Sequence, residues 1–244
     1  KCFVVLSNSI TLISDQRWRL VRSILSVYKH FILICCMQHY TGAAAIRKKR
    51  TTQIRRPDAT LYSVQLFSTE GFSSDSALLY HTHPPTQIIK TDKPYSVMPE
   101  IAEEKMLQHR SFQGFNIKPD DDYIKSRKPV LVNNDCHISL AAPAKSMKDY
   151  FYKNADADEI IFVHEGAGKI KTQYGELPFG YGDYVVIPRG SIYQVEFDTK
   201  DNRLFIVEAF SPVRYPKKYL SNYGQLLENA PYCERDIRIP ENLQ

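Results

Sequence analysis

A closely spaced series of short apolar segments between Ala157 and Phe210 constrains the fold more than any other feature of this sequence. Each segment is of strand length and rich in β-branched and aromatic residues, and glycines or charged turns separate it from the next. The segments are EIIFVHEG, GKIKTQYG, DYVVIPRG, IYQVEF and RLFIVEAF. Short strands at such regular spacing are typical of a β-sandwich or barrel.

Similar segments precede this series, namely TLYSVQLF, SALLYH and PVLVN. Pro99–Arg110 is instead predicted as a short helix, because a proline lies in its first turn and basic residues lie at its end. After Phe210 the chain is irregular and contains several prolines. We therefore expect a mainly β (all-β) fold with a few short helices.

The N-terminal residues of the chain are basic, and the remainder is nearly neutral. The formal net charge is +5, and residues 1–36 contribute five basic residues and one acidic residue to it, which leaves +1 for the rest. This beginning is apolar but repeatedly interrupted by polar residues, lacks the order of a secretory signal, and has no uncharged stretch long enough to span a bilayer. We predict that residues 1–36 are a non-native or disordered extension; a membrane-surface helix is the alternative.

A second basic cluster, RKKRTTQIRR, lies within a polar arm that we assign to residues 37–58. Such a cluster can bind nucleic acid, but no recognisable nucleic-acid motif accompanies it. We interpret it as a solvated arm or a subunit contact, and we expect neither nucleic acid nor a membrane as a partner.

The cysteines indicate a reducing compartment. The chain has five of them, an odd number, and no CxxC pair. This pattern is neither a disulfide framework nor a zinc knuckle. A cytoplasmic location is therefore expected.

The segment from Gly182 to Tyr193 matches a motif that forms a tight turn between two strands in small metal-binding barrels of the cupin type. That motif reads G-x5-P-x-G-x2-H, and Gly182, Pro188 and Gly190 have the required spacing. At the position of its final histidine, which is a metal ligand, the chain has Tyr193. The turn is retained and its ligand is not.

The partner motif, G-x5-H-x-H-x(3,4)-E-x6-G, is retained only at its end, where Glu159 and Gly166 have the expected spacing. With the longer spacing, Tyr152 and Asn154 stand where the two histidines belong, and the shorter spacing supplies no histidine either. Three His and one Glu hold a divalent metal in such barrels, since imidazole and carboxylate suit Fe, Mn, Ni or Zn. With three of four ligands missing, we predict no metal here.

Other histidines offer weaker candidates. His81 and His83, in YHTHPPTQ, are two residues apart and would lie on the same side of a strand, but the pair lacks a third ligand. A packing or hydrogen-bonding role is favoured for it. His164 directly follows EIIFV and is predicted in a turn, and His137 is predicted as an inward strand histidine with a hydrogen bond.

Beyond these motifs, nearly all of residues 37–244 resembles homogentisate 1,2-dioxygenase of the bacterial type. The stretches that carry this resemblance are RRPDATLYSVQLFSTEGF, LLYHTHPPTQI, VLVNNDCHISLAAP, DYFYKNADADEIIFVHEGAGKIKTQYGELPFGYGDYVVIPRGSIYQVEF and APYCERDIRIPENL. They occur in the order in which the family has them. The match is more specific than the cupin spacing alone.

The resemblance implies a two-cupin enzyme that opens the aromatic ring of homogentisate with O2 to give maleylacetoacetate, in tyrosine and phenylalanine catabolism. Its Fe(II) is held by two His and one Glu, the arrangement expected of non-haem iron oxygenases. The resemblance also implies a homo-oligomer, a hexamer built from trimers. No H-x5-E pattern follows Phe210, so none of the family's iron ligands matches a position here.

We therefore interpret residues 59–244 as the N-terminal cupin (jelly-roll) domain of such a dioxygenase, truncated before the C-terminal catalytic cupin. This interpretation predicts a fragment that is inactive alone, with no catalytic, cofactor-binding or metal-binding residue. One alternative is a metal-free cupin module that binds a small organic ligand between Tyr152, Asn154 and Tyr193. Another is a stand-alone metalloenzyme that uses His81 and His83.

Overall fold

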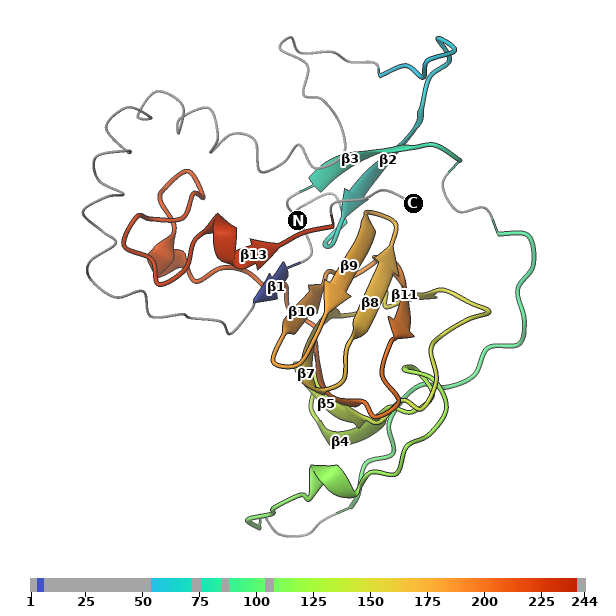
Figure 1. The fold of residues 1–244 in the computed structure, drawn as a ribbon, viewed down its shortest axis with the longest axis vertical. Helices are drawn as coiled ribbons and strands as arrows, with labels where there is room; N and C mark the ends of the chain where they lie inside the picture. Colours follow the sequence, from blue (N-terminus) through green and yellow to red (C-terminus); the bar gives the residue numbers. More distant parts are fainter. Residues whose placement is uncertain (1–3, 7–53, 72–75, 85–87, 104–107, 241–244) are drawn as a thin grey trace.

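The structure is a computed structural model that describes residues 4–6, 54–71, 76–84, 88–103 and 108–240, and two sheets face each other in it as a β-sandwich (Figure 1). The larger sheet has seven strands, in the spatial order β13 (Ile237–Arg238), β1 (Val4–Leu6), β10 (Tyr184–Ile187), β7 (Asp158–Glu165), β12 (Arg203–Ala209), β5 (Cys136–Ala141) and β4 (Lys128–Val132). The smaller sheet has four, in the order β6 (Tyr152–Lys153), β11 (Ile192–Phe197), β8 (Gly168–Thr172) and β9 (Gly175–Phe179). The predicted cupin-type, mainly β fold is confirmed.

The remaining elements are short. A separate hairpin consists of β2 (Ser63–Ser68) and β3 (Ser76–His81). The helices within the described ranges are single 3-10 turns, η2 (Gly114–Asn116), η3 (Lys217–Tyr219) and η4 (Glu234–Asp236). None of them is long and apolar enough to cross a membrane.

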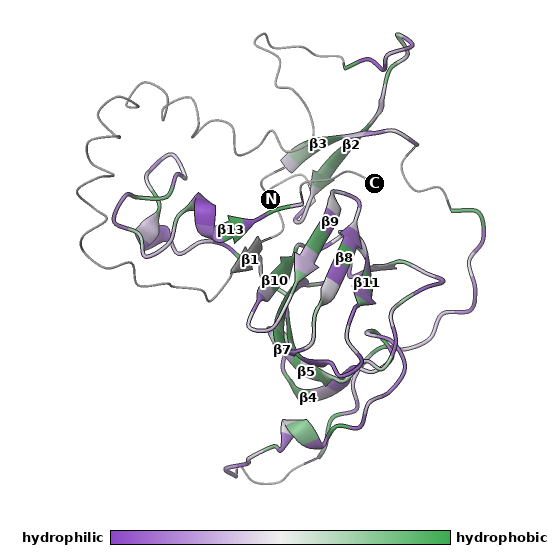
Figure 2. Cartoon of the chain, viewed as in Figure 1, coloured by the Kyte–Doolittle hydropathy of each residue, from purple (hydrophilic) through white to green (hydrophobic). Residues whose placement is uncertain are grey.

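Alternation of side chains along each strand builds the core between the two sheets. In β8 the residues Gly168, Ile170 and Thr172 are buried, whereas the lysines between them are half-buried. In β7, Ile161 and Val163 are buried and point to the same interior. Because successive side chains point to opposite faces of a strand, one face of each sheet supplies the core. Figure 2 shows apolar residues in the strands and more hydrophilic colouring in many connecting segments.

The turn glycines of the motif from Gly182 to Tyr193 explain its retained spacing. Gly182 and Gly190 have φ of 84° and 81°, a region in which glycine is not strained and other residues are. Ser191 N donates to Pro188 O at 3.1 Å and closes a four-residue turn with Gly190 at its third position. A positive φ at that position is what a type II turn requires. Gly190 N also donates to Asn154 O at 2.7 Å, which ties the second motif to the first.

Strand β9 and the two-residue strands β6 and β13 were not predicted. β9 contains Pro178, which argues against a strand in a sheet interior. However, β9 lies at the edge of the smaller sheet, where the missing N–H of Pro178 costs no ladder hydrogen bond. β5 follows β4 after a short turn in which Asn133 Oδ1 accepts from Cys136 N at 2.7 Å.

The N-terminal extension and the predicted helix are each described only in part. Val4–Leu6 forms β1, which pairs antiparallel with β10 and β13, and the assignment of residues 1–36 as a non-native or disordered extension stays a prediction. A β-strand there satisfies the backbone groups at the edge of β10. The rest of residues 1–36 lies outside the described residues. In Pro99–Arg110, residues 99–103 and 108–110 have no helical structure, and 104–107 are not described.

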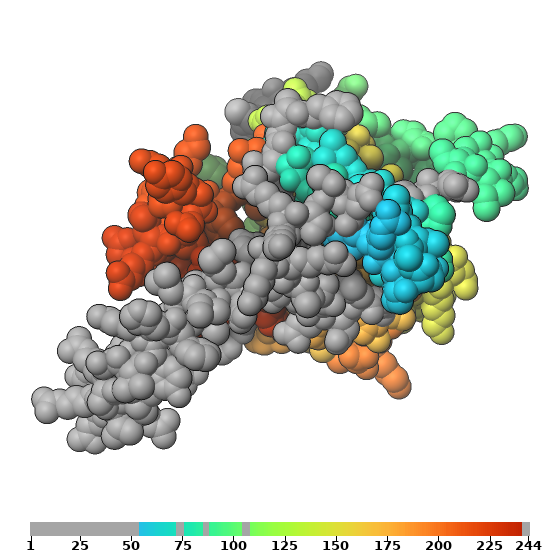
Figure 3. All heavy atoms as spheres, turned by 90° about the horizontal axis from the view of Figure 1, so that it is seen from above, coloured from blue at the N-terminus to red at the C-terminus, as the bar shows by residue number. Residues whose placement is uncertain are grey.

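Segments on either side of the sandwich extend away from it. Residues after β12 form a lobe on one side, and residues 88–103 run along the other, as Figures 1 and 3 both show. Of the predicted basic arm, residues 37–53 are not described. Arg56 contacts its own chain, since its Nη2 donates to Thr82 O at 2.6 Å and its guanidinium lies 5.4 Å from the Tyr62 ring centre.

Gly168 provides a test of the sandwich packing. A Cβ at this position would lie 2.1 Å from Glu196 O of the adjacent strand β11, whereas a Cβ on Gly180 would meet nothing within 4 Å. We expect Gly168→Ala to lower the free energy of unfolding by about 1–3 kcal/mol, as overpacking does. The matched control Gly180→Ala should change it by less than about 1 kcal/mol. Urea denaturation measures both values, and equal midpoints for the two variants would contradict this packing.

Candidate functional site

The four positions that the cupin motifs assign to metal ligands come together inside the barrel formed by the two sheets. Tyr152 lies on β6, Glu159 on β7 and Tyr193 on β11, while Asn154 follows β6 directly. Glu159 and Tyr193 have no exposed surface, and Asn154 is 8% exposed. The rings of Tyr152 and Tyr193, which are paired residues of β6 and β11, pack edge to face.

Hydrogen bonds fix the direction in which each polar group points. Tyr193 OH donates to Glu159 Oε2. Asn154 Oδ1 accepts from Asp156 N at 3.1 Å and Ala157 N at 3.0 Å, so its amide nitrogen faces the interior. That nitrogen lies 2.8 Å from Glu208 Oε1 and 3.4 Å from Glu159 Oε1. Asn154 and Tyr193 therefore each direct a hydrogen atom at a carboxylate, and Glu159 and Glu208 act only as acceptors.

Arg127, which the sequence analysis missed, supplies the cation of this interior. Its Nη1 donates to Glu159 Oε1 at 2.6 Å and lies 3.6 Å from Glu208 Oε1, and its Nη2 donates to Tyr193 OH at 3.1 Å. The guanidinium carbon lies 4.4 Å from the ring centre of Tyr123 and 5.4 Å from that of Tyr152. Stacking on rings and hydrogen bonding in the guanidinium plane are the two interactions that arginine favours.

A turn just before β4 positions Arg127. Asp122 Oδ1 accepts from the backbone N–H of Ile124 at 3.1 Å and of Lys125 at 3.0 Å, and Ser126 N donates to Asp122 O at 2.9 Å. Tyr123 and Arg127 lie at the two ends of this turn, and the guanidinium of Arg127 packs on the ring of Tyr123. No motif marks Arg127, which stands between two segments of ordinary composition, so only long-range structure reveals it.

The protonation states follow from burial and from Glu159. Burial lowers the pKa of Arg127, but the carboxylate of Glu159 and the neighbouring tyrosines raise it well above its ordinary value. Burial, followed by Glu159, raises the pKa of Tyr193 well above its ordinary value. Arg127 is thus a cation and Tyr193 a neutral phenol. Additional hydrogen bonds satisfy the Nη atoms of Arg127, while its buried Nε has no hydrogen-bond partner.

This interior does not fit a divalent metal. A metal ion needs several lone pairs that converge on it, whereas Asn154 and Tyr193 direct hydrogen atoms inward and the guanidinium of Arg127 already occupies the carboxylates. Within the described ranges, no group of three His, Cys, Asp or Glu side chains lies close enough together to hold a metal.

The histidine candidates do not assemble. His81 lies on β3 and its Nε2 is 2.8 Å from Gln65 Oε1, which agrees with a hydrogen-bonding role; His83 lies beyond the strand end. His164 lies within β7 rather than in a turn, because β7 continues through Glu165. The ring of His137, on β5, packs edge to face on Phe210.

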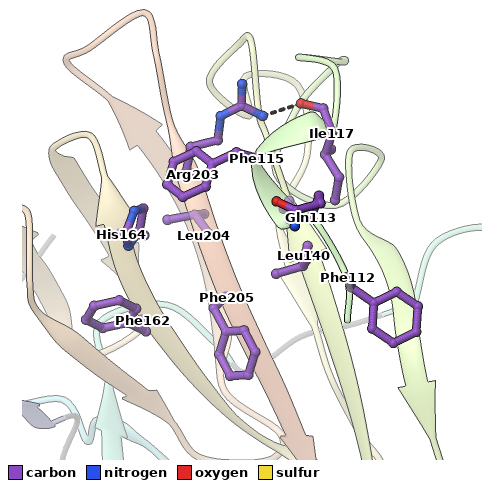
Figure 4. Close-up of a pocket in the computed structure, with 12 residues that line it drawn as sticks. Phe112, Gln113, Phe115, Ile117, Leu140, Phe162, His164, Arg203, Leu204 and Phe205 are labelled. Carbon is purple, nitrogen blue, oxygen red and sulfur yellow. Dashed lines mark hydrogen bonds between the residues drawn. The ribbon is translucent and has the colours of Figure 1, made fainter. Parts of the chain in front are cut away.

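The larger cavity lies outside the barrel interior and not within it. The space in the apolar core of the barrel measures only about 10 Å³, room for at most one water molecule. A larger cavity of about 380 Å³ lies on the outer face of the seven-stranded sheet (Figure 4). Arg203 of β12 lies at one end of it and donates to Ile117 O. Five of the residues that line it are aromatic: Phe112, Phe115, Phe162, His164 and Phe205.

The sandwich, the two glycine-containing turns and the paired motif positions define a cupin. Residues 122–240 match the family model described as "Homogentisate 1,2-dioxygenase N-terminal". This part of the chain is similar to the N-terminal cupin domain of homogentisate dioxygenases.

One curated relative and two solved structures illustrate the similarity. The chain is 33% identical over 204 residues to "Putative dioxygenase SSO1533" of Saccharolobus solfataricus, a match that covers 84% of this chain and 52% of that protein. The chain thus spans about half the length of this relative. A cupin-2 domain protein of Shewanella frigidimarina is 21% identical, with 39% of this chain and 87% of that chain covered and a TM-score of 0.33. Salicylate 1,2-dioxygenase of Pseudoaminobacter salicylatoxidans is 17% identical, with 31% and 20% covered and a TM-score of 0.28.

The hydroxyl of Tyr193 tests the interior network. Tyr193→Phe removes the donor to Glu159 and the acceptor of Arg127 and leaves the ring in place. Because hydrogen bonds to charged groups contribute about 1.5–3 kcal/mol, we expect the free energy of unfolding to fall by about this amount. The control Tyr181→Phe, on a side chain that is 78% exposed, should change it by less than about 0.5 kcal/mol. Equal losses in both variants would refute the network.

The same tyrosines predict a loss of stability at alkaline pH. Burial, followed by Glu159, raises the pKa of Tyr152 to about 12. The pKa of tyrosine in an unfolded chain is about 10. Above that pH the unfolded state loses protons that the folded state keeps, so the free energy of unfolding falls. Denaturation midpoints at a series of pH values should show this fall and a shallower one for Tyr152→Phe. An identical pH dependence in the variant would contradict the assignment.

Proposed function

We propose that this chain is the N-terminal portion of an Fe(II)-dependent ring-cleaving dioxygenase that converts homogentisate and O2 to maleylacetoacetate. The match of residues 122–240 to the N-terminal domain of that family carries the proposal. The name of the 33% identical relative, a dioxygenase, supports the reaction class. In the net reaction one carbon–carbon bond of the ring breaks and both oxygen atoms of O2 enter the product, so no external reductant is needed.

The interior of this barrel supports a division of labour within the enzyme. Because Arg127 and inward-pointing protons fill the position of the metal, the iron of the full-length enzyme belongs to a part of the protein beyond this chain. The proposed role of residues 59–244 is a scaffold that packs against that part and builds subunit contacts. A cytoplasmic homo-oligomer based on trimers and a place in tyrosine and phenylalanine catabolism belong to the same proposal.

The outer face of the seven-stranded sheet supports the scaffold role. Tyr184, Phe162, Phe205 and Leu140 are register partners across β10, β7, β12 and β5, and form one continuous row. Tyr184 and Phe205 are each 39% exposed. Large exposed apolar surfaces mark sites of association.

The alternative of a metal-free binding module loses its predicted site. Tyr193 and Tyr152 contact the guanidinium of Arg127, which lies where that module would place its ligand. The cavity of about 380 Å³ on the outer sheet face is the one observation that favours a ligand-binding role, at a different place. Its aromatic lining and the nearby guanidinium of Arg203 would suit a small aromatic acid.

A comparison of two proteins tests the proposed function: this chain alone, and the chain extended by the coding sequence downstream of Gln244. Both are loaded anaerobically with Fe(II), and bound iron and O2 uptake with homogentisate are measured. We expect stoichiometric iron and homogentisate-dependent O2 uptake in the extended protein only. Stoichiometric iron with O2 uptake in the chain alone would overturn the division of labour. Iron in the extended protein without homogentisate consumption would overturn the substrate.

A further inference from the structure

The interior site has the position of a cupin metal centre, but side chains there donate hydrogen bonds where a metal centre would supply ligand lone pairs. Its two acceptors, Glu159 and Glu208, are joined by the amide nitrogen of Asn154, whose oxygen is turned away to the backbone. The remaining polar neighbour, Tyr193, donates to Glu159. A cation held here must therefore donate hydrogen bonds to the carboxylates instead of accepting lone pairs from several sides.

We propose that the guanidinium of Arg127 takes the place of a metal ion in this barrel, so that the interior is a guanidinium-binding site whose ligand belongs to the chain itself. Nη1 reaches both carboxylates, at 2.6 and 3.6 Å, and Nη2 reaches the hydroxyl of Tyr193 at 3.1 Å. These partners lie around the ion, while the rings of Tyr123 and Tyr152 lie within cation–π distance of it.

The shape of this site selects a planar cation. Edge acceptors together with aromatic rings match a guanidinium, and an ammonium ion, which is compact and strongly hydrated, matches them less well. A divalent metal would face the hydrogen atoms of Asn154 and Tyr193. The inference concerns the barrel interior and holds whatever reaction the full-length protein performs.

Three substitutions separate the charge of Arg127 from its volume. Arg127→Met keeps much of the volume and leaves Glu159 buried without a cation, so we expect the Tm to fall by about 10 °C. Arg127→Lys should lose clearly less, because it keeps a charge. Arg127→Met combined with Glu159→Gln should recover part of the loss. A surface control, Arg214→Met, which breaks the exposed pair with Glu70, should shift the Tm by less than about 3 °C.

These shifts decide between a cation and a space-filling side chain. If Arg127→Met matches or exceeds Arg127→Lys in Tm, and Glu159→Gln brings no recovery, the interior needs volume and not charge, and the proposal is overturned.

Chemical rescue provides a readout that a merely structural role would not move. Arg127→Ala leaves space for a free cation, so methylguanidinium, far below denaturing concentrations, should raise the Tm of Arg127→Ala and leave the wild-type Tm unchanged. Binding to the folded state alone makes the Tm increase with ligand concentration. Urea, which is planar and neutral, is the matched control and should not rescue. Mn²⁺ should not rescue either.

If Arg127→Ala does not fold in buffer, the same additives are compared during refolding, with the soluble folded fraction as the readout. Recovery with methylguanidinium and not with urea supports the proposal. Equal effects of the two, no effect of methylguanidinium, or rescue by Mn²⁺ as strong as that by methylguanidinium would overturn it.

Discussion

The hydrogen-bonded ion pair between Arg127 and Glu159 holds the barrel interior together. Glu159 is fully buried on the central strand β7, and an unpaired carboxylate there would be expensive to desolvate. Removing one partner of a buried ion pair costs roughly 3–5 kcal/mol, a large share of the stability of an ordinary domain. Arg127 also contacts Tyr152 of β6, Tyr193 of β11 and Glu208 of β12. The pair therefore joins both sheets to the turn that precedes β4.

The cupin scaffold and the cupin chemistry are separable in this chain. Gly182 and Gly190 keep the backbone conformations that shape the turns, and Gly190 still binds the backbone of Asn154. The residues at the motif's histidine positions, Tyr152, Asn154 and Tyr193, are not imidazole ligands. Turn geometry depends on local φ preferences, whereas the ligand set depends on side chains that pack across the sheets, and the second can change without disturbing the first.

Local signals predicted most of the fold, and long-range contacts account for what was missed. Alternating apolar residues and turn glycines indicated β7, β8, β10, β11 and β12. β9 was missed because the sequence does not reveal that Pro178 lies on an edge strand. Arg127 was missed because its partners Glu159 and Tyr193 are 32 and 66 residues away. The motif spacing could show which ligands were absent, but it could not show what balances the remaining carboxylate.

A cation that belongs to the chain has a consequence that a metal would not have. The guanidinium reaches the interior when the turn at Asp122–Ser126 forms and β4 pairs with β5, so the site is complete as soon as the sandwich folds. Metal binding instead couples stability to metal supply and to pH through the deprotonation of its ligands. The charge of Glu159 in this barrel is therefore balanced by Arg127 and not by a metal. In the proposed enzyme, such a half can act as a fixed scaffold while iron enters and leaves the other.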